Sequence, residues 1–172
     1  MGVALAVAAT ALQAWAQPKA EEPPPATVAR VVAGIVSYTR WPEDLSSIRL
    51  CTLGLGPGVE ALARAGEFGA PGRRVSVVAV PNLGAAERGC HAVYLGRTGG
   101  PDARQTVRLF AGRPVLLLGE GADFCTEGGM FCIEPASESA RFGVNLDAVA
   151  RSGLRVNPQV LRIARGGGGQ GS

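Results

Sequence analysis

The chain has 172 residues, of which 47% are hydrophobic and 18% charged, and its formal net charge is +3. A chain of this length suits one domain with a sizeable core. Its positive charges are scattered arginines with a single lysine, and Arg73-Arg74 is the only adjacent basic pair. The sequence therefore gives no indication of a nucleic-acid partner.

An uncharged apolar run at the N-terminus predicts export. Gly2–Leu12 is followed by Ala14-Trp15-Ala16, the small-x-small pattern of a signal-peptidase site. We expect a signal peptide over residues 1–16, because the run is shorter than the roughly 20 apolar residues that span a bilayer. Residues 17–25 are then a linker rich in proline and glutamate. The alternative is that the run forms a buried N-terminal helix of the domain.

The remaining elements alternate between helices and strands. Apolar residues spaced i, i+3, i+4, i+7 and i+8 from Val28 predict an amphipathic helix over 27–38, which Trp41-Pro42 ends. Further strands are predicted at 48–53, 74–80, 91–95, 114–118, 130–134 and 141–145, and further helices at 57–65, 103–110 and 146–151 and, capped by Asn157, from Pro158 onward. Gly153 suits the left-handed position after the helix at 146–151, with Leu154 as its apolar contact.

This order predicts an α/β fold. We expect a largely parallel sheet of about six strands with helices on both faces. The strands at 130–134 and 141–145 are candidates for an antiparallel edge pair. The domain is expected to occupy residues 26–165, and the glycine-rich segment 166–172 to be a disordered tail.

Four cysteines follow the leader, at Cys51, Cys90, Cys125 and Cys132. In an exported protein such cysteines usually form disulfides. Four cysteines allow three pairings, and the sequence alone does not choose among them. A turn at Gly128-Gly129 favours a bond between Cys125 and Cys132, whereas Cys51 and Cys90 lie at or beside two strands that could be neighbours.

The sequence offers no catalytic or metal-binding pattern. The cysteine spacings of 39, 35 and 7 residues do not match the close pairs of zinc sites, and C-x-x-C is absent. Gly54-x-Gly56-x-Gly58 matches neither the G-x-G-x-x-G pattern nor the P-loop pattern of nucleotide-binding sites. It is interpreted as a turn before a helix that starts at Pro57. His91 is interpreted as a structural or surface residue. We therefore expect no metal, no cofactor and no enzymatic activity.

An ordered set of motifs resembles the YfiR family of exported bacterial proteins. The motifs are Tyr38-Thr39-Arg40-Trp41-Pro42, Cys51-Thr52-Leu53-Gly54, Gly128-Gly129-Met130, Arg141-Phe142-Gly143-Val144-Asn145-Leu146, Ser152-Gly153-Leu154-Arg155-Val156 and Gln159-Val160-Leu161-Arg162-Ile163-Ala164. The resemblance covers about residues 26–165.

The resemblance implies a periplasmic regulator with an α/β fold. The best-known member of the family represses a membrane-bound diguanylate cyclase, YfiN, by binding its periplasmic part, and an outer-membrane lipoprotein, YfiB, sequesters the repressor. These interactions control cyclic di-GMP and biofilm formation. The resemblance further implies a homodimer and the disulfides Cys51–Cys90 and Cys125–Cys132.

The predicted partner surface lies in the segment 146–161, with Leu146, Val149, Arg151 and Val160 as exposed candidates. The short Cys125–Cys132 loop is the better candidate for reversible reduction, whereas the alternative is that both disulfides only stabilise the fold. Two other functions compete with repression: a periplasmic small-molecule-binding sensor and, least favoured, a thiol-dependent enzyme.

Overall fold

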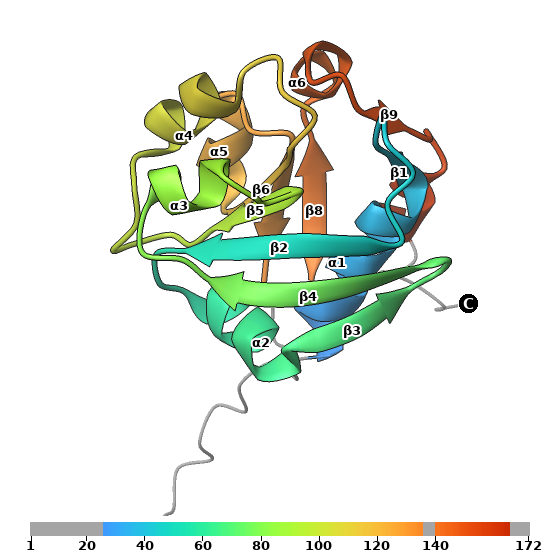
Figure 1. Cartoon of the computed structure of the whole chain (residues 1–172), viewed down its shortest axis with the longest axis horizontal. Helices are drawn as coiled ribbons and strands as arrows, with labels where there is room; N and C mark the ends of the chain where they lie inside the picture. The colour runs from blue at the N-terminus through green and yellow to red at the C-terminus, as the bar shows by residue number, and fades with distance from the viewer. Residues whose placement is uncertain (1–25, 136–139, 166–172) are drawn as a thin grey trace, which may run out of the picture.

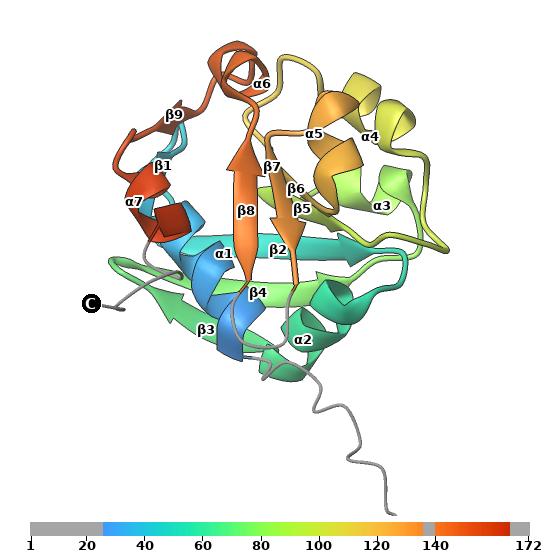
Figure 2. The same cartoon turned by 180° about the vertical axis from the view of Figure 1, so that it is seen from behind.

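A computed structural model describes residues 26–135 and 140–165. The predicted signal peptide (1–16), linker (17–25) and tail (166–172) lie outside the described residues. The described part is built around a seven-stranded sheet with helices on both faces (Figures 1 and 2). The prediction of an α/β fold is confirmed.

The sheet is parallel in its centre and antiparallel at both edges. Its strand order is β3 (Glu67–Ala70), β4 (Arg73–Ala79), β2 (Ser47–Leu53), β5 (Ala92–Leu95), β6 (Leu116–Glu120), β7 (Phe131–Glu134) and β8 (Arg141–Val144). The four central pairs are parallel, whereas β3–β4 and β7–β8 are antiparallel. The predicted edge pair is therefore confirmed, and β3, which was not predicted, raises the strand count from about six to seven.

The first helix fits the predicted stripe. In α1 (Ala26–Tyr38) the five predicted apolar positions are all buried. The helix covers the face of β2 and β4 that is turned away from the viewer in Figure 1. Gly34 of this helix allows α7 (Val160–Arg165) to approach, since a Cβ atom there would lie 2.5 Å from Cδ1 of Ile163.

The other helices are short and divide between the two faces. On the side of α1 lies α2 (Pro57–Ala65), which contacts α1, whereas α3 (Leu83–Glu87) contacts α4 (Ala103–Phe110). α5 (Ala122–Thr126) connects β6 to β7, and α6 (Leu146–Arg151) follows β8. None of the helices in the described ranges is long and apolar enough to cross a membrane.

The C-terminal segment returns to the start of the domain. After α6, Gly153 takes a positive φ of 76° and Leu154 is buried, as predicted. β9 (Arg155–Val156) then pairs antiparallel with β1 (Thr39–Arg40). α7 begins at Val160 rather than at Pro158, because the first residues after Asn157 form a turn in which the Asn157 carbonyl accepts from the Val160 N–H.

Candidate functional site

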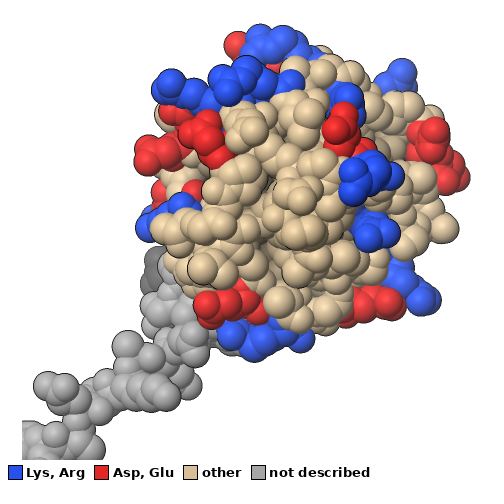
Figure 3. Space-filling view, turned by 60° about the vertical axis from the view of Figure 1, so that its left-hand side comes forward, with Lys and Arg blue, Asp and Glu red and all other residues tan. Residues whose placement is uncertain are grey.

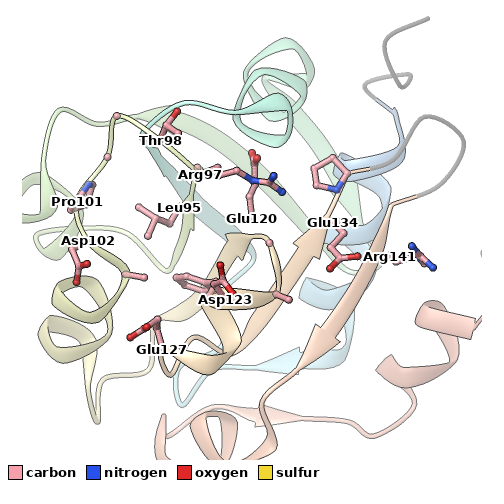
Figure 4. A pocket seen from close by; sticks show the side chains of 18 residues that line it. Leu95, Arg97, Thr98, Pro101, Asp102, Glu120, Asp123, Glu127, Glu134 and Arg141 are labelled. Atoms are coloured by element: carbon pink, nitrogen blue, oxygen red, sulfur yellow. The ribbon is translucent and has the colours of Figure 1, made fainter. Parts of the chain in front are cut away.

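A cleft of about 750 Å³ opens at the carboxyl ends of β5, β6 and β7 (Figure 4). It is lined by residues 95–103 and 120–124 and by Glu127, Glu134, Pro135 and Arg141. From β2 the chain continues to β4 on one side and then crosses to β5 on the other. In open α/β sheets ligands bind beside such a reversal, at the carboxyl ends of the strands, and the volume is in the range of small-molecule sites.

Glu120 is the most unusual residue of this cleft. It is the last residue of β6, and only 7% of its surface is exposed. Its Oε1 accepts hydrogen bonds from the backbone N–H groups of Gly58 (2.8 Å) and Val59 (3.1 Å), at the N-terminus of α2. The carboxylate thus occupies the position at which a helix N-terminus would hold an anionic ligand.

The glycine-rich turn before α2 makes room for this carboxylate. A Cβ atom at Gly56 would overlap Oε2 of Glu120, and one at Gly58 would overlap the Tyr94 hydroxyl. The prediction of a turn followed by a helix from Pro57 is confirmed. The glycines are needed because a side chain from β6 fills the space beneath the turn.

Glu120 and Tyr94 are two buried polar residues on neighbouring strands of the core. Within the described residues neither Oε2 of Glu120 nor the Tyr94 hydroxyl has a hydrogen-bond partner. Burial raises the pKa of Glu120, although the two backbone N–H groups and Arg97 act in the opposite direction. Burial and the nearby Glu120 carboxylate also raise the pKa of Tyr94. Oε2 of Glu120 and the Tyr94 hydroxyl are therefore buried polar atoms whose loss of hydration is not fully compensated.

Charged side chains of both signs line the rest of this cleft. Asp102 caps α4, its Oδ1 accepting from the Gln105 N–H at 3.1 Å. Glu127 forms an ion pair with Arg104, in which Nη2 of the arginine lies 3.0 Å from Oε1. Arg104 holds the pKa of Glu127 below its ordinary value through this hydrogen bond. The rim of the cleft is thus fixed by local contacts, whereas Glu120 lies deeper.

A second recess, of about 440 Å³, is an apolar groove between α4 and α6. We call it the α4–α6 groove. It is lined by Val107, Phe110, Ala111, Gly112, Leu117, Gly128, Met130, Ala148, Arg151 and Ser152. α6 contributes one wall, and Leu146 at the start of α6 is 68% exposed.

The predicted partner residues are not all on the surface. Leu146 and Arg151 are exposed and Val149 is half-buried, all three on α6. Val160 is only 2% exposed, so the prediction that it is an exposed candidate is wrong. It is the first residue of α7 and belongs to the hydrophobic core, because α7 packs against α1.

Both disulfides are present, with the pairing that the resemblance implies. Cys51 of β2 is bonded to Cys90, just before β5, across a Cα–Cα distance of 5.9 Å, and both residues are buried. Cys125 of α5 is bonded to Cys132 of β7 across 5.4 Å. No cysteine of the chain is left free.

His91 has a structural position beside the first disulfide. Its Nδ1 accepts from the Arg49 backbone N–H at 3.0 Å, and its carbonyl accepts from Nε1 of Trp41 at 3.2 Å. Burial lowers the pKa of His91. These contacts join the start of β5 to β2 and to the segment after α1.

Sequence reasoning gave a small-molecule sensor as an alternative function, but it identified neither Glu120 nor Tyr94 nor the other residues of the cleft. One signal was present: Glu120 directly follows the uniformly buried run of β6, at the end of the strand where parallel sheets place ligands. In the described ranges, the cleft included, no group of three or more His, Cys, Asp or Glu side chains could hold a metal ion.

A disulfide-containing α/β domain with an open cleft and an apolar groove is typical of a small binding domain. The chain belongs to the YfiR/HmsC-like family, whose model matches residues 25–165. Proteins of this family are periplasmic regulators of diguanylate cyclases, regulatory rather than catalytic. The two disulfides fit the oxidising compartment in which the family is found.

Proposed function

We propose that the chain is a periplasmic protein that binds and represses a membrane-bound diguanylate cyclase, and so lowers cyclic di-GMP and biofilm formation. The observation that carries this proposal is the family match over residues 25–165. Repression requires only that the protein binds the inactive form of the cyclase more tightly than the active form. The predicted signal peptide over residues 1–16 would deliver the protein to the periplasmic part of the cyclase.

The proposed docking surface for a YfiN-like cyclase is the α4–α6 groove with the exposed face of α6. Leu146 is an exposed large apolar residue at the start of α6, the helix whose Ala148 and Arg151 line the mainly apolar groove. Exposed apolar surface of this kind is typical of interaction sites. Arg151 lies at the rim, where its contact with Asp147, at 3.7 Å and exposed, contributes little to stability. It is therefore available to an acidic group of a partner.

Redox sensitivity would act on this same surface. Gly128 and Met130, which line the groove, lie inside the loop that the Cys125–Cys132 disulfide closes. Reduction would release this loop and loosen one wall of the groove. We propose that oxidised protein binds the cyclase more tightly than reduced protein.

Two further partners belong to the proposal. A YfiB-like outer-membrane lipoprotein would compete with the cyclase for the repressor, and the repressor would form a homodimer. No nucleic-acid partner is proposed. On the face shown in Figure 3, acidic and basic residues are interspersed around an uncharged central area, unlike the continuous basic surface of a nucleic-acid-binding protein.

The test is deletion of the gene in its host, followed by measurement of cyclic di-GMP. The level should rise on deletion and return with the wild-type gene. Leu146→Asp should fail to restore repression, because a charge replaces an apolar contact, whereas Leu55→Asp should restore it. Leu55 is a matched control, since it is 64% exposed and belongs to the turn before α2 rather than to α6. An unchanged level after deletion would contradict cyclase repression.

A second function, that of a periplasmic small-molecule sensor, is supported by the cleft at the carboxyl ends of β5, β6 and β7. Its position and volume are those of ligand sites in α/β proteins. The two functions are compatible, because a ligand in the cleft could change the affinity for the cyclase. They are separated experimentally, since ligand binding is measured on the purified protein without any cyclase.

A further inference from the structure

Two segments are joined at the carboxyl ends of β2 and β5. The Leu55 N–H donates to the Thr98 carbonyl at 2.6 Å, and the Thr98 N–H donates to the Leu55 carbonyl at 3.2 Å. We call the two segments, residues 54–59 and 96–100, the clasp. In open α/β sheets the loops at a reversal of strand order separate and leave room for a ligand. Here they are bonded to each other, and 96–100 forms one wall of the adjacent cleft.

The backbones of the clasp approach each other too closely for side chains. A Cβ atom at Gly96 would lie 2.6 Å from the Leu55 carbonyl oxygen. A Cβ atom at Gly54 would lie 2.8 Å from the Thr98 carbonyl oxygen. Because the two segments are in direct backbone contact, a change that displaces one half of the clasp also disturbs the other half.

Glu120 supports the clasp from below. Its Oε1 accepts from the N–H groups of Gly58 and Val59. A Cβ atom at Gly56 would overlap both carboxyl oxygens, so the carboxyl group lies directly under this turn. Its Oε2 is buried from solvent and has no hydrogen-bond partner among the described residues. Full hydration of this carboxyl group therefore requires that the turn above it moves away.

The charge of Glu120 sets the free energy of that movement. Burial raises the pKa of Glu120, and the negative charge of Glu60 acts in the same direction, whereas the two backbone N–H groups and Arg97 act against them. Arg97 is exposed and lies beside Glu120 in Figure 4, so solvent screens its charge. Tyr94 also faces Glu120 and stays neutral, because burial raises the pKa of its hydroxyl. Protonated Glu120 thus favours the closed clasp, and ionised Glu120 favours the open one.

We propose that a proton on Glu120 holds the clasp closed, and that release of this proton lets the two segments part and reshapes the wall of the cleft. The pKa of Glu120 is raised only while the clasp buries it, so the closed clasp holds the proton more tightly than the open one. Opening therefore becomes more frequent as pH rises above the ordinary value of 4.5, until Glu120 is ionised in both states. This device goes beyond the proposed function, because it requires neither a cyclase nor a ligand.

The test is amide hydrogen exchange of the purified oxidised protein at several pH values from 4.5 upward, because exchange reports local opening. The amides that measure the clasp are those of Leu55, Gly58, Val59 and Thr98. The reference is the Asn157 amide, which donates to the Tyr38 carbonyl at 2.9 Å and corrects for the intrinsic effect of pH on exchange. The ratio of clasp to reference exchange should rise with pH, by up to about tenfold for each unit by which the clasp raises the pKa of Glu120.

Two variants assign the titration to Glu120. In Glu120→Gln the ratio should no longer depend on pH. Glu60→Gln is the matched control, since it removes a negative charge beside the clasp but leaves Glu120 in place. Glu60 is exposed and its contact with Arg64, at 3.9 Å, contributes little to stability, so this variant should fold and keep the wild-type pH dependence.

The wild type alone can overturn the proposal, even if Glu120→Gln fails to fold. A wild-type ratio that stays constant or falls as pH rises would show that proton release does not open the clasp. An unchanged pH dependence in folded Glu120→Gln would assign the titration to another group, and would also overturn the proposal. Because no cyclase is present in these experiments, their failure is distinct from a failure of cyclase repression.

Discussion

The two disulfides should stabilise the domain by different amounts, which the lengths of the loops they close predict. Cys51–Cys90 spans 39 residues of sequence and Cys125–Cys132 spans 7. In the chain-entropy model these loops correspond to about 4 and about 2.4 kcal/mol at 25 °C. The difference depends only on the ratio of the loop lengths and is about 1.5 kcal/mol.

The experiment compares two double variants, Cys51→Ala with Cys90→Ala and Cys125→Ala with Cys132→Ala, by urea unfolding of the oxidised proteins. The free energy of unfolding typically falls by about 1–3 kcal/mol per molar urea, so the two unfolding midpoints should differ by roughly 0.5–1.5 M. The variant that lacks Cys51–Cys90 should unfold at the lower urea concentration. Burial acts in the same direction, because Cys51 is fully buried and its replacement also removes packing contacts. If the variant that lacks Cys125–Cys132 is as unstable as the variant that lacks Cys51–Cys90, or less stable, loop entropy does not determine how much each disulfide stabilises the domain.

Three further predictions concern Glu120, the glycine turn before α2 and the cysteines. Because burial raises the pKa of Glu120 in the folded state, the folded protein binds this proton more readily than the unfolded chain, so the stability that Glu120 confers should fall as pH rises above its ordinary value of 4.5. The free energy of unfolding, measured at several pH values, should therefore decline less with rising pH in Glu120→Gln than in the wild type. Parallel curves for the two proteins would contradict a raised pKa of Glu120. Gly58→Ala should destabilise by about 1–3 kcal/mol, because its methyl group meets the Tyr94 hydroxyl. The control is Gly84→Ala in α3, where the nearest contact of the new methyl group is at 3.5 Å, and this variant should be neutral or stabilising in thermal melting. An unchanged melting temperature of Gly58→Ala would show that the turn before α2 relaxes freely. Thiol titration of denatured, unreduced protein should detect no free thiol; two or more would contradict oxidation in the periplasm.

The parts of the fold that were predicted from sequence depend on short-range patterns. The spacing of apolar residues in α1 and the continuous apolar runs of β5 and β6 indicate their type of secondary structure directly. Gly153 is another local signal, since its left-handed conformation depends only on the helix that it follows. β3 was missed because Glu67–Ala70 is four residues long and contains Gly69, which does not favour a strand.

The parts that were not predicted depend on contacts between distant segments. Glu120 acquires its role from N–H groups 61 and 62 residues earlier in the chain, which no local pattern reveals. Val160 was expected on the surface because a short helix leaves open which side faces inward. Its burial is decided by α1, where Gly34 lets α7 come close.

The pairing of β1 with β9 has a consequence for the order in which the protein matures. Thr39 pairs with Val156, which comes near the C-terminal end of the described sequence, so this small sheet closes only after nearly the whole polypeptide has been synthesised. Cys51 and Cys90 emerge long before that moment and can be oxidised while the later strands are still missing. The N-terminal half can therefore be cross-linked early, and arrival of the last helix completes a structure whose centre is already covalently held.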